Sequence, residues 1–161
     1  MDNTTPDLEY DPQSCAGAVN YDEIAFTERV YEFHFDPAYM QQLERCNGGS
    51  PKKRYFAIPG NVKVIERFLC VISSVSTGKR HGWNDMGVVI TQIEDRLGEF
   101  MVPFAALFAG DYLCFDGENS DPPKIIVWDH ERSREGNPVT IPVADDFTTF
   151  LSLLYADQQG Q

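Results

Sequence analysis

The stretch from Pro103 to Asp116 constrains the fold of this chain more than any other. An apolar run ends at Gly110 and Asp111, a pair that favours a turn, because Gly reaches backbone angles closed to other residues and Asp can bond its own backbone. Residues 112–115 then alternate as a β-strand does, with every second side chain on the same face. The carboxylates of Asp111 and Asp116 therefore flank a predicted strand.

Two helices are predicted ahead of this strand. A helical period begins at Tyr21 and ends before Pro37, because proline disfavours helix at the residue that precedes it. Asp36 can cap the second helix, with Pro37 at its first position. The segment Asn47-Gly48-Gly49 ends that helix, since its glycines reach left-handed backbone angles at no steric cost. On the first helix one apolar face is expected to be buried, formed by Ile24, Phe26, Val30 and Tyr31.

Strand-like segments rich in β-branched and aromatic residues make up most of the remaining chain. Loops separate them, including a long one predicted over residues 73–85. Residues 86–97 fit either a strand or a helix, and we favour the helix because the residues around 94–96 are polar and solvated. Asp146 is expected to cap a final helix that carries Phe147 and Phe150. The predicted strands cover residues 54–58, 62–73, 112–115, 124–129 and 139–143.

Helices and strands that are separated rather than alternating predict an α+β fold. We expect a single domain over residues 21–155, in which an N-terminal helical hairpin and a C-terminal helix pack on an antiparallel sheet. Residues 1–20 are acidic and contain few large apolar groups, which predicts a flexible N-terminal arm. Residues 156–161 are expected to form a short flexible tail.

The formal net charge of −12 limits the partners of this chain. It argues against nucleic acid and against an anionic membrane surface, because binding phosphates requires clustered Lys and Arg. A basic protein partner remains, as does the simpler explanation that the charge maintains solubility.

The four cysteines are too few for a disulfide scaffold, and no Cys-x-x-Cys pair occurs, which predicts a reducing, cytoplasmic location. Cys70 and Cys114 lie in apolar runs and are expected to be small buried residues. The acidic N-terminus does not match a signal peptide, and no apolar stretch approaches the roughly 20 residues that span a bilayer.

Acidic residues gather between positions 110 and 146, where nine acids accompany three bases. A solvated face is the ordinary explanation, and Asp111 can simply stabilise its own turn. The same stretch is also the best candidate surface for a cationic partner, whose approach an acidic field accelerates. The candidate partner-binding residues are Asp111, Asp116, Glu118, Asp121, Asp129 and Glu131.

Catalytic motifs are absent from the sequence. It contains no Ser/His/Asp ordering with an elbow glycine, no phosphate loop and no His-Glu-x-x-His zinc helix. Asp129 and Glu131 would share one face of a strand and could hold a cation, although solvated edge charges are the commoner explanation. We therefore expect no enzyme activity, no cofactor and no metal site.

Four segments, in the right order, resemble the SUKH superfamily in its cell-wall-assembly-regulator (Smi/Knr-like) branch. The resemblance covers roughly residues 21–155. Several signature residues also have structural explanations, because Phe104 and Phe115 suit a core and Trp128 could fill the space beside the final helix. The segments are the second helix with Asn47-Gly48-Gly49, Pro103-Phe104-Ala105 with residues 110–116, residues 126–131 around Trp128, and residues 143–151 with Phe147 and Phe150.

This resemblance implies an immunity protein, which binds and neutralises a cognate toxin that is often a nuclease. The charge agrees with that role, because nuclease sites are basic and an acidic protein can occlude them. The alternative, implied by eukaryotic relatives, is a regulatory or scaffold module that binds several proteins. A third possibility is a small-molecule groove near Trp83 or Trp128.

Overall fold

The computed structural model describes residues 8–72 and 82–157, and in these ranges it contains four α-helices and one six-stranded sheet. This arrangement confirms the predicted single-domain α+β fold. The helices are α1 (Tyr21–Tyr31), α2 (Pro37–Arg45), α3 (Met86–Ile93) and α4 (Phe147–Leu153), with short 3-10 helices η1 (Pro12–Ser14), η3 (Gly82–Asn84) and η4 (Glu94–Arg96). The strands are β1 (Tyr55–Ile58), β2 (Asn61–Phe68), β3 (Met101–Leu107), β4 (Tyr112–Asp116), β5 (Lys124–Trp128) and β6 (Thr140–Ala144).

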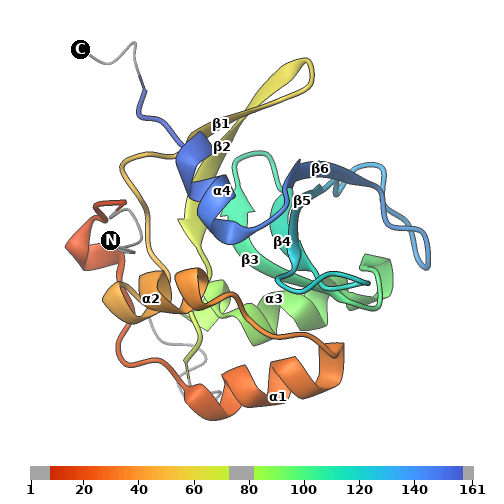
Figure 1. The fold of residues 1–161 in the computed structure, drawn as a ribbon, viewed down its shortest axis with the longest axis horizontal. Coiled ribbons are helices and arrows are strands. Elements are labelled where there is room, and N and C mark those ends of the chain that lie inside the picture. Colours follow the sequence, from red (N-terminus) through yellow and green to blue (C-terminus); the bar gives the residue numbers. More distant parts are fainter. Residues whose placement is uncertain (1–7, 73–81, 158–161) are drawn as a thin grey trace.

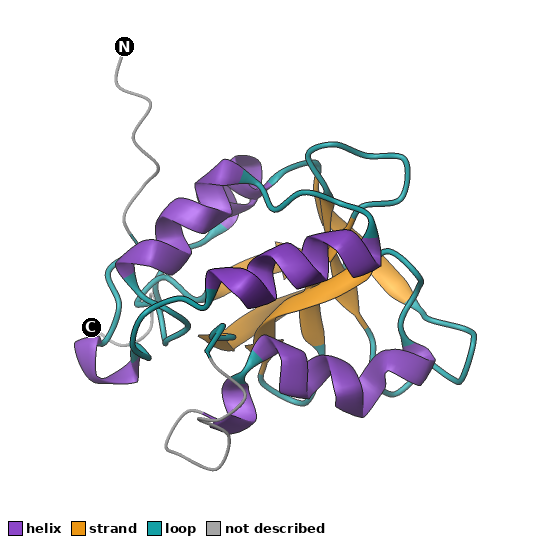
Figure 2. Cartoon of the chain, turned by 90° about the horizontal axis from the view of Figure 1, so that it is seen from below, coloured by secondary structure: helices purple, strands orange, loops and turns teal. Residues whose placement is uncertain are grey.

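Each strand pairs antiparallel with the next in the chain, so the sheet order is β1-β2-β3-β4-β5-β6. Pro103 lies in β3 beside a register shift, which is a place where a strand tolerates proline. The sheet curves around α4: Phe150 of this helix packs on Phe56 of β1, while the helix also contacts β5 and β6 (Figure 1). Helices α1 to α3 gather at the other end of the molecule, and Figure 2 views that end with the strands behind the helices.

Local capping chemistry produces the helix ends that the sequence predicts. Asp36 accepts a hydrogen bond from the backbone N–H of Ala38 at 3.0 Å, with Pro37 at the first helical position. The second carboxylate oxygen of Asp36 accepts from the N–H of Phe147 at 3.2 Å, which ties α2 to α4. Asp146 caps α4 through the N–H of Thr149 at 2.7 Å.

The predicted stop at Asn47-Gly48-Gly49 joins three parts of the chain. Gly48 has a φ of +77°, and a Cβ there would come within 2.9 Å of Cys70. The Asn47 side-chain amide donates to the carbonyls of Gly17 and Val71, at 3.0 and 3.1 Å, and its carbonyl accepts from the N–H of Val71 at 2.8 Å. The turn therefore fixes the N-terminal segment against the residues that follow β2.

An aromatic core lies between the sheet and helices α2 and α4. Phe104 and Phe115 stack with ring centroids 4.3 Å apart, and both are completely buried. Tyr39, Phe147 and Phe150 pack edge-on against Phe104, which confirms these phenylalanines as core residues.

Trp128 is also fully buried, but its position corrects the expectation that it lies beside the final helix. Its Nε1 donates to the carbonyl of Arg96 at 2.9 Å, and the Arg96 guanidinium lies 5.0 Å from the centre of its ring. Tyr112 is its other aromatic neighbour. Trp128 therefore fixes η4 against the sheet.

The buried face of α1 differs in part from the predicted one. The predicted apolar face of α1 is wrong for Phe26 and Val30, which are 53% and 52% exposed, whereas Ile24 is buried and Tyr31 packs partly buried against the core. The buried side of α1 passes through Ile24 and Thr27, and Phe26 lies about 200° around the helix from Ile24. The helix predicted over residues 86–97 is confirmed over residues 86–96, as α3 followed by the 3-10 helix η4. Strand β2 ends at Phe68, and the predicted loop over residues 73–85 lies outside the described residues as far as 81, with η3 at its end.

The N-terminal segment is attached, in contrast to the expected flexible arm. Leu8 is only 2% exposed, and the hydroxyl of Tyr10 donates to Gln42 at 3.1 Å. A disulfide joins Cys15 to Cys46 at the end of α2, which the cysteine count did not predict. Residues 1–7 of the arm lie outside the described residues.

The remaining cysteines are buried as expected. Burial raises the pKa of Cys70 to about 11 and also raises the pKa of Cys114. None of the helices in the described ranges has the length and apolar composition needed to cross a bilayer.

Candidate interaction surface

The β4–β5 hairpin separates the predicted acidic residues into two groups. Antiparallel strands of five residues each place the two ends of the hairpin about 15 Å apart, at roughly 3.3 Å per residue. One group lies where β4 begins and β5 ends, and the other lies at the turn between the strands. The first group is Asp111, Asp129 and Glu131, and the second is Asp116, Glu118 and Asp121.

Asp111 is buried, with 6% of its surface exposed, and its carboxylate is used inside the molecule. One oxygen accepts from the ammonium of Lys63 at 2.8 Å. The other lies 2.7 Å from Nδ1 of His130 and accepts from the His130 backbone N–H at 3.0 Å. Asp111 therefore joins β2 to the end of β5.

The electrostatics of this corner favour the charged form of Asp111. Burial alone would raise the pKa of its carboxyl, but the hydrogen bonds from His130 and Lys63 outweigh burial and lower the pKa below its ordinary value. Gly110 makes this approach possible, because it has a φ of +99° and a Cβ there would lie 3.0 Å from the His130 ring.

The same corner has the composition of a metal site. Asp111, Asp129 and His130 each offer a ligand atom, and these atoms lie within 4.8 Å of one another. Glu131, which could have shared a cation with Asp129 on one strand face, is not part of this group. One oxygen of Asp129 accepts from the backbone N–H groups of Glu131 and Arg132, at 3.0 and 3.1 Å. Because Asp111 is also engaged by an ammonium, we interpret the corner as a structural junction.

The turn at the other end of the hairpin keeps its acidic side chains exposed. Asp116 is half-buried and accepts from the N–H of Glu118 at 3.1 Å, which shapes the turn. Glu118 and Asp121 are exposed. Lys124 pairs with Asp116 across the hairpin and is the only basic residue between positions 116 and 124.

Packing brings two further acidic residues to this turn from distant parts of the chain. The N–H of Gly117 donates to the carbonyl of Phe100 at 3.0 Å, so Glu99 lies beside the turn. A Cβ on Gly117 would come within 2.7 Å of Phe33, which places the exposed Glu32 at the same end. No signal in the sequence marks these two residues, because only the tertiary contacts bring them together.

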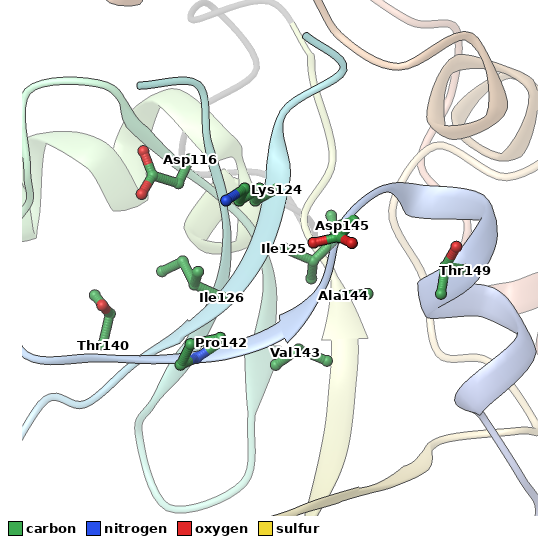
Figure 3. Close-up of a pocket in the computed structure, with 10 residues that line it drawn as sticks. All are labelled: Asp116, Lys124, Ile125, Ile126, Thr140, Pro142, Val143, Ala144, Asp145 and Thr149. Atoms are coloured by element: carbon green, nitrogen blue, oxygen red, sulfur yellow. The ribbon is translucent and has the colours of Figure 1, made fainter. Parts of the chain in front are cut away.

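A hollow of about 500 Å³ opens next to the turn, over the outer part of β5 and β6. Figure 3 shows Asp116 and Asp145 on either side of Lys124 along one rim, with Thr140 and Pro142 of β6 further along the surface. The hollow is lined by Asp116, Lys124, Ile125, Ile126, Thr140, Pro142, Val143, Ala144, Asp145 and Thr149. We call the carboxylates that surround this turn and hollow the acidic end: Glu32, Glu99, Asp116, Glu118, Asp121 and Asp145.

The far end of the hairpin carries less excess charge. Asp129 forms an ion pair with Arg132 at 3.7 Å, and exposed Arg134 lies in the same loop as Glu131 and Glu135. Bases therefore offset most of the acids at this end, whereas Lys124 stands among several acids at the other.

Comparison with protein families finds a match over residues 21–151, which is most of the chain. The matching family is SUKH_6, described as SMI1-KNR4 cell-wall. No curated protein and no solved structure matches the chain.

Proposed function

Because the chain belongs to the SMI1-KNR4 cell-wall family, we propose that it is a non-catalytic protein-binding module, and specifically an immunity protein that neutralises a cognate toxin in the cytoplasm. The observation that carries the proposal is the acidic end. Its carboxylates come from the residue after α1, the residues before β3, the β4–β5 turn and the residue after β6, and Lys124 lies among them.

The acidic end suits a partner with a basic binding or catalytic site. Toxins that act on nucleic acids hold phosphates with Lys and Arg, and an acidic surface can cover such a site. Opposite charges also raise the rate at which the two proteins meet, and this effect weakens as salt screens them. The buried Asp111 and the capping carboxylate of Asp129 are not part of the proposed contact surface.

The proposal is tested by affinity capture of the tagged protein from its native host at low and at moderate salt, with bound proteins identified by mass spectrometry. We expect one basic toxin whose capture is weaker at the higher salt concentration. Capture of several unrelated proteins would contradict the immunity role and favour a regulatory or scaffold module.

A charge-reversal pair then tests the surface. Glu118→Lys with Asp121→Lys should slow association with the captured partner at least about tenfold at low salt. Glu131→Lys with Glu135→Lys is the matched control, because it changes the net charge equally at the far end of the hairpin. Equal slowing by both pairs would show that only net charge matters, and would remove the acidic end as the contact surface.

A further inference from the structure

We propose that the hollow beside β6 binds an extended segment of the partner through side chains, with an apolar residue on its floor and a lysine or arginine at its rim. This inference rests on the proposed function and names the chemistry that the partner should present. It follows from the free edge of the sheet, the position of Pro142, and the charges around the hollow.

Strand β6 forms the free edge of the sheet within residues 8–72 and 82–157. It pairs with β5 on one side and is the last strand in the sheet order. The opposite edge strand, β1, is covered where Tyr55 and Tyr155 exchange two backbone hydrogen bonds of 3.0 Å. A partner that binds at an edge of the sheet is therefore expected to contact β6.

Pro142 blocks simple strand addition at that edge. The N–H of Asp129 donates to the carbonyl of Val139 at 2.9 Å, which makes these two residues a hydrogen-bonded pair. Because hydrogen-bonded and non-hydrogen-bonded pairs alternate, Ile126 and Pro142 form a non-hydrogen-bonded pair. The backbone nitrogen of Pro142 then faces the free edge, where it has no hydrogen to donate.

Contacts by side chains are the remaining way to occupy this region. The hollow has apolar groups from Ile126, Pro142 and Val143, and its volume of about 500 Å³ admits several side chains. Pro142 is exposed, so apolar surface is available at the β6 side of the hollow.

The charges around the hollow favour a positively charged side chain on the bound segment. Asp116 and Asp145 flank Lys124 along the rim, and exposed Glu118 and Asp121 lie in the adjoining turn. The rim is therefore negative overall, and a cationic side chain is favoured there over an anionic one. Lys124 competes with such a side chain for the same carboxylates.

The test is an NMR titration of the isotope-labelled protein with the capped tripeptides Lys-Leu-Lys and Glu-Leu-Glu. We expect the lysine peptide to shift the amide signals of residues 124–126, 140, 141, 143–145 and 149. Weaker or absent shifts with the glutamate peptide are also expected. Equal binding of the two peptides, or lysine-peptide shifts confined to other elements, would overturn the proposal.

Two neighbouring threonines on α4 provide a matched pair of variants. Thr149 lines the hollow and Thr148 does not, although both are exposed. Thr149→Arg should weaken binding of the lysine peptide about tenfold by adding a like charge, whereas Thr148→Arg should leave it unchanged. Equal effects of the two would overturn the assignment. Thr140→Arg repeats the test from β6 if Thr149→Arg does not fold.

Two more variants separate the contributions of charge and backbone. Lys124→Gln should tighten binding of the lysine peptide by up to about fivefold, the range for one exposed charge pair. Pro142→Thr restores an N–H to the free edge and should leave the affinity unchanged, whereas tighter binding would show that the peptide pairs as a strand. These titrations need no natural partner, so a failed capture experiment refutes the proposed function and leaves the inference about the hollow standing.

Discussion

Replacing Asp111 with Asn should destabilise the fold more than any other single change of an acidic residue in the β4–β5 region. The substitution keeps the shape of the side chain but removes its charge. Lys63, whose side chain is 18% exposed, then lacks its carboxylate partner, and the Asn amide group competes for the position beside His130.

The size of the effect follows from these contacts. Hydrogen bonds to charged groups contribute about 1.5–3 kcal/mol each, and breaking a fully buried ion pair costs about 3–5 kcal/mol. Lys63 is partly exposed and Asn retains one acceptor for the His130 N–H, so we expect a loss of about 2–3 kcal/mol in the free energy of unfolding.

Urea denaturation followed by circular dichroism measures this loss. Asp129→Asn is the control, since that carboxylate mainly caps a surface turn, and it should cost about 1 kcal/mol. Lys63→Met alone and with Asp111→Asn completes a double-mutant cycle, in which we expect a coupling of more than about 1 kcal/mol. A loss below about 0.5 kcal/mol for Asp111→Asn, or additive single effects, would refute the reasoning.

The stabilisation by Asp111 should also depend on pH. The pKa of Asp111 is lower in the folded protein than its ordinary value of 3.8, so the unfolded chain binds the proton more readily. The contribution is therefore complete above pH values near 3.8 and is lost as the pH falls through the lower, folded pKa. Unfolding measured between neutral and acidic pH should show wild type and Asp111→Asn converging at the acidic end.

Three further changes have distinct expected outcomes. Tyr39→Phe should be neutral or stabilise by up to about 1 kcal/mol, because the buried Tyr39 hydroxyl has no hydrogen-bond partner within the described residues; a clear loss in thermal unfolding would contradict this. Reducing the disulfide between Cys15 and Cys46, which are 31 residues apart, should cost about 3–4 kcal/mol by chain entropy and speed hydrogen exchange in residues 8–20. Thiol trapping in cells decides the compartment, since a reduced pair supports the cytoplasm and an oxidised pair opposes it. Gly117→Ala should lower the free energy of unfolding in urea by about 1–3 kcal/mol, because the added Cβ would clash with Phe33. An unchanged urea midpoint would contradict the close contact between this turn and Phe33.

The parts of the fold that follow from neighbouring residues were predictable from the sequence. Asp36 with Pro37 and Asp146 begin helices through hydrogen bonds to N–H groups two or three residues along the chain. The turn at Asn47 and Gly48 follows directly after α2, where the sequence places it. The order of helices and strands likewise distinguishes an α+β fold, in which they are separated, from a fold in which they alternate.

Contacts between distant residues account for what the sequence did not reveal. Cys15 meets Cys46 only because residues 8–20 fold back over α2, and one sequence contains no mark of that pairing. The face of α1 was misjudged for a related reason. Phe26 and Val30 are apolar, but helical spacing places Phe26 about 200° and Val30 about 120° around the helix from Ile24. With Ile24 and Thr27 buried, both side chains remain exposed.

The predicted acidic surface shows how closeness in the sequence can mislead. Residues 111–131 form one continuous acidic stretch in the chain, but pairing of β4 with β5 sends its two halves to opposite ends of a hairpin. At one end, the carboxylate of Asp111 is engaged by Lys63 and His130, and the carboxylate of Asp129 caps a turn. At the other, Glu118 and Asp121 stay exposed beside the hollow. Variants that change acids at only one end therefore separate stability from binding, whereas reversing charges at both ends at once would confound them.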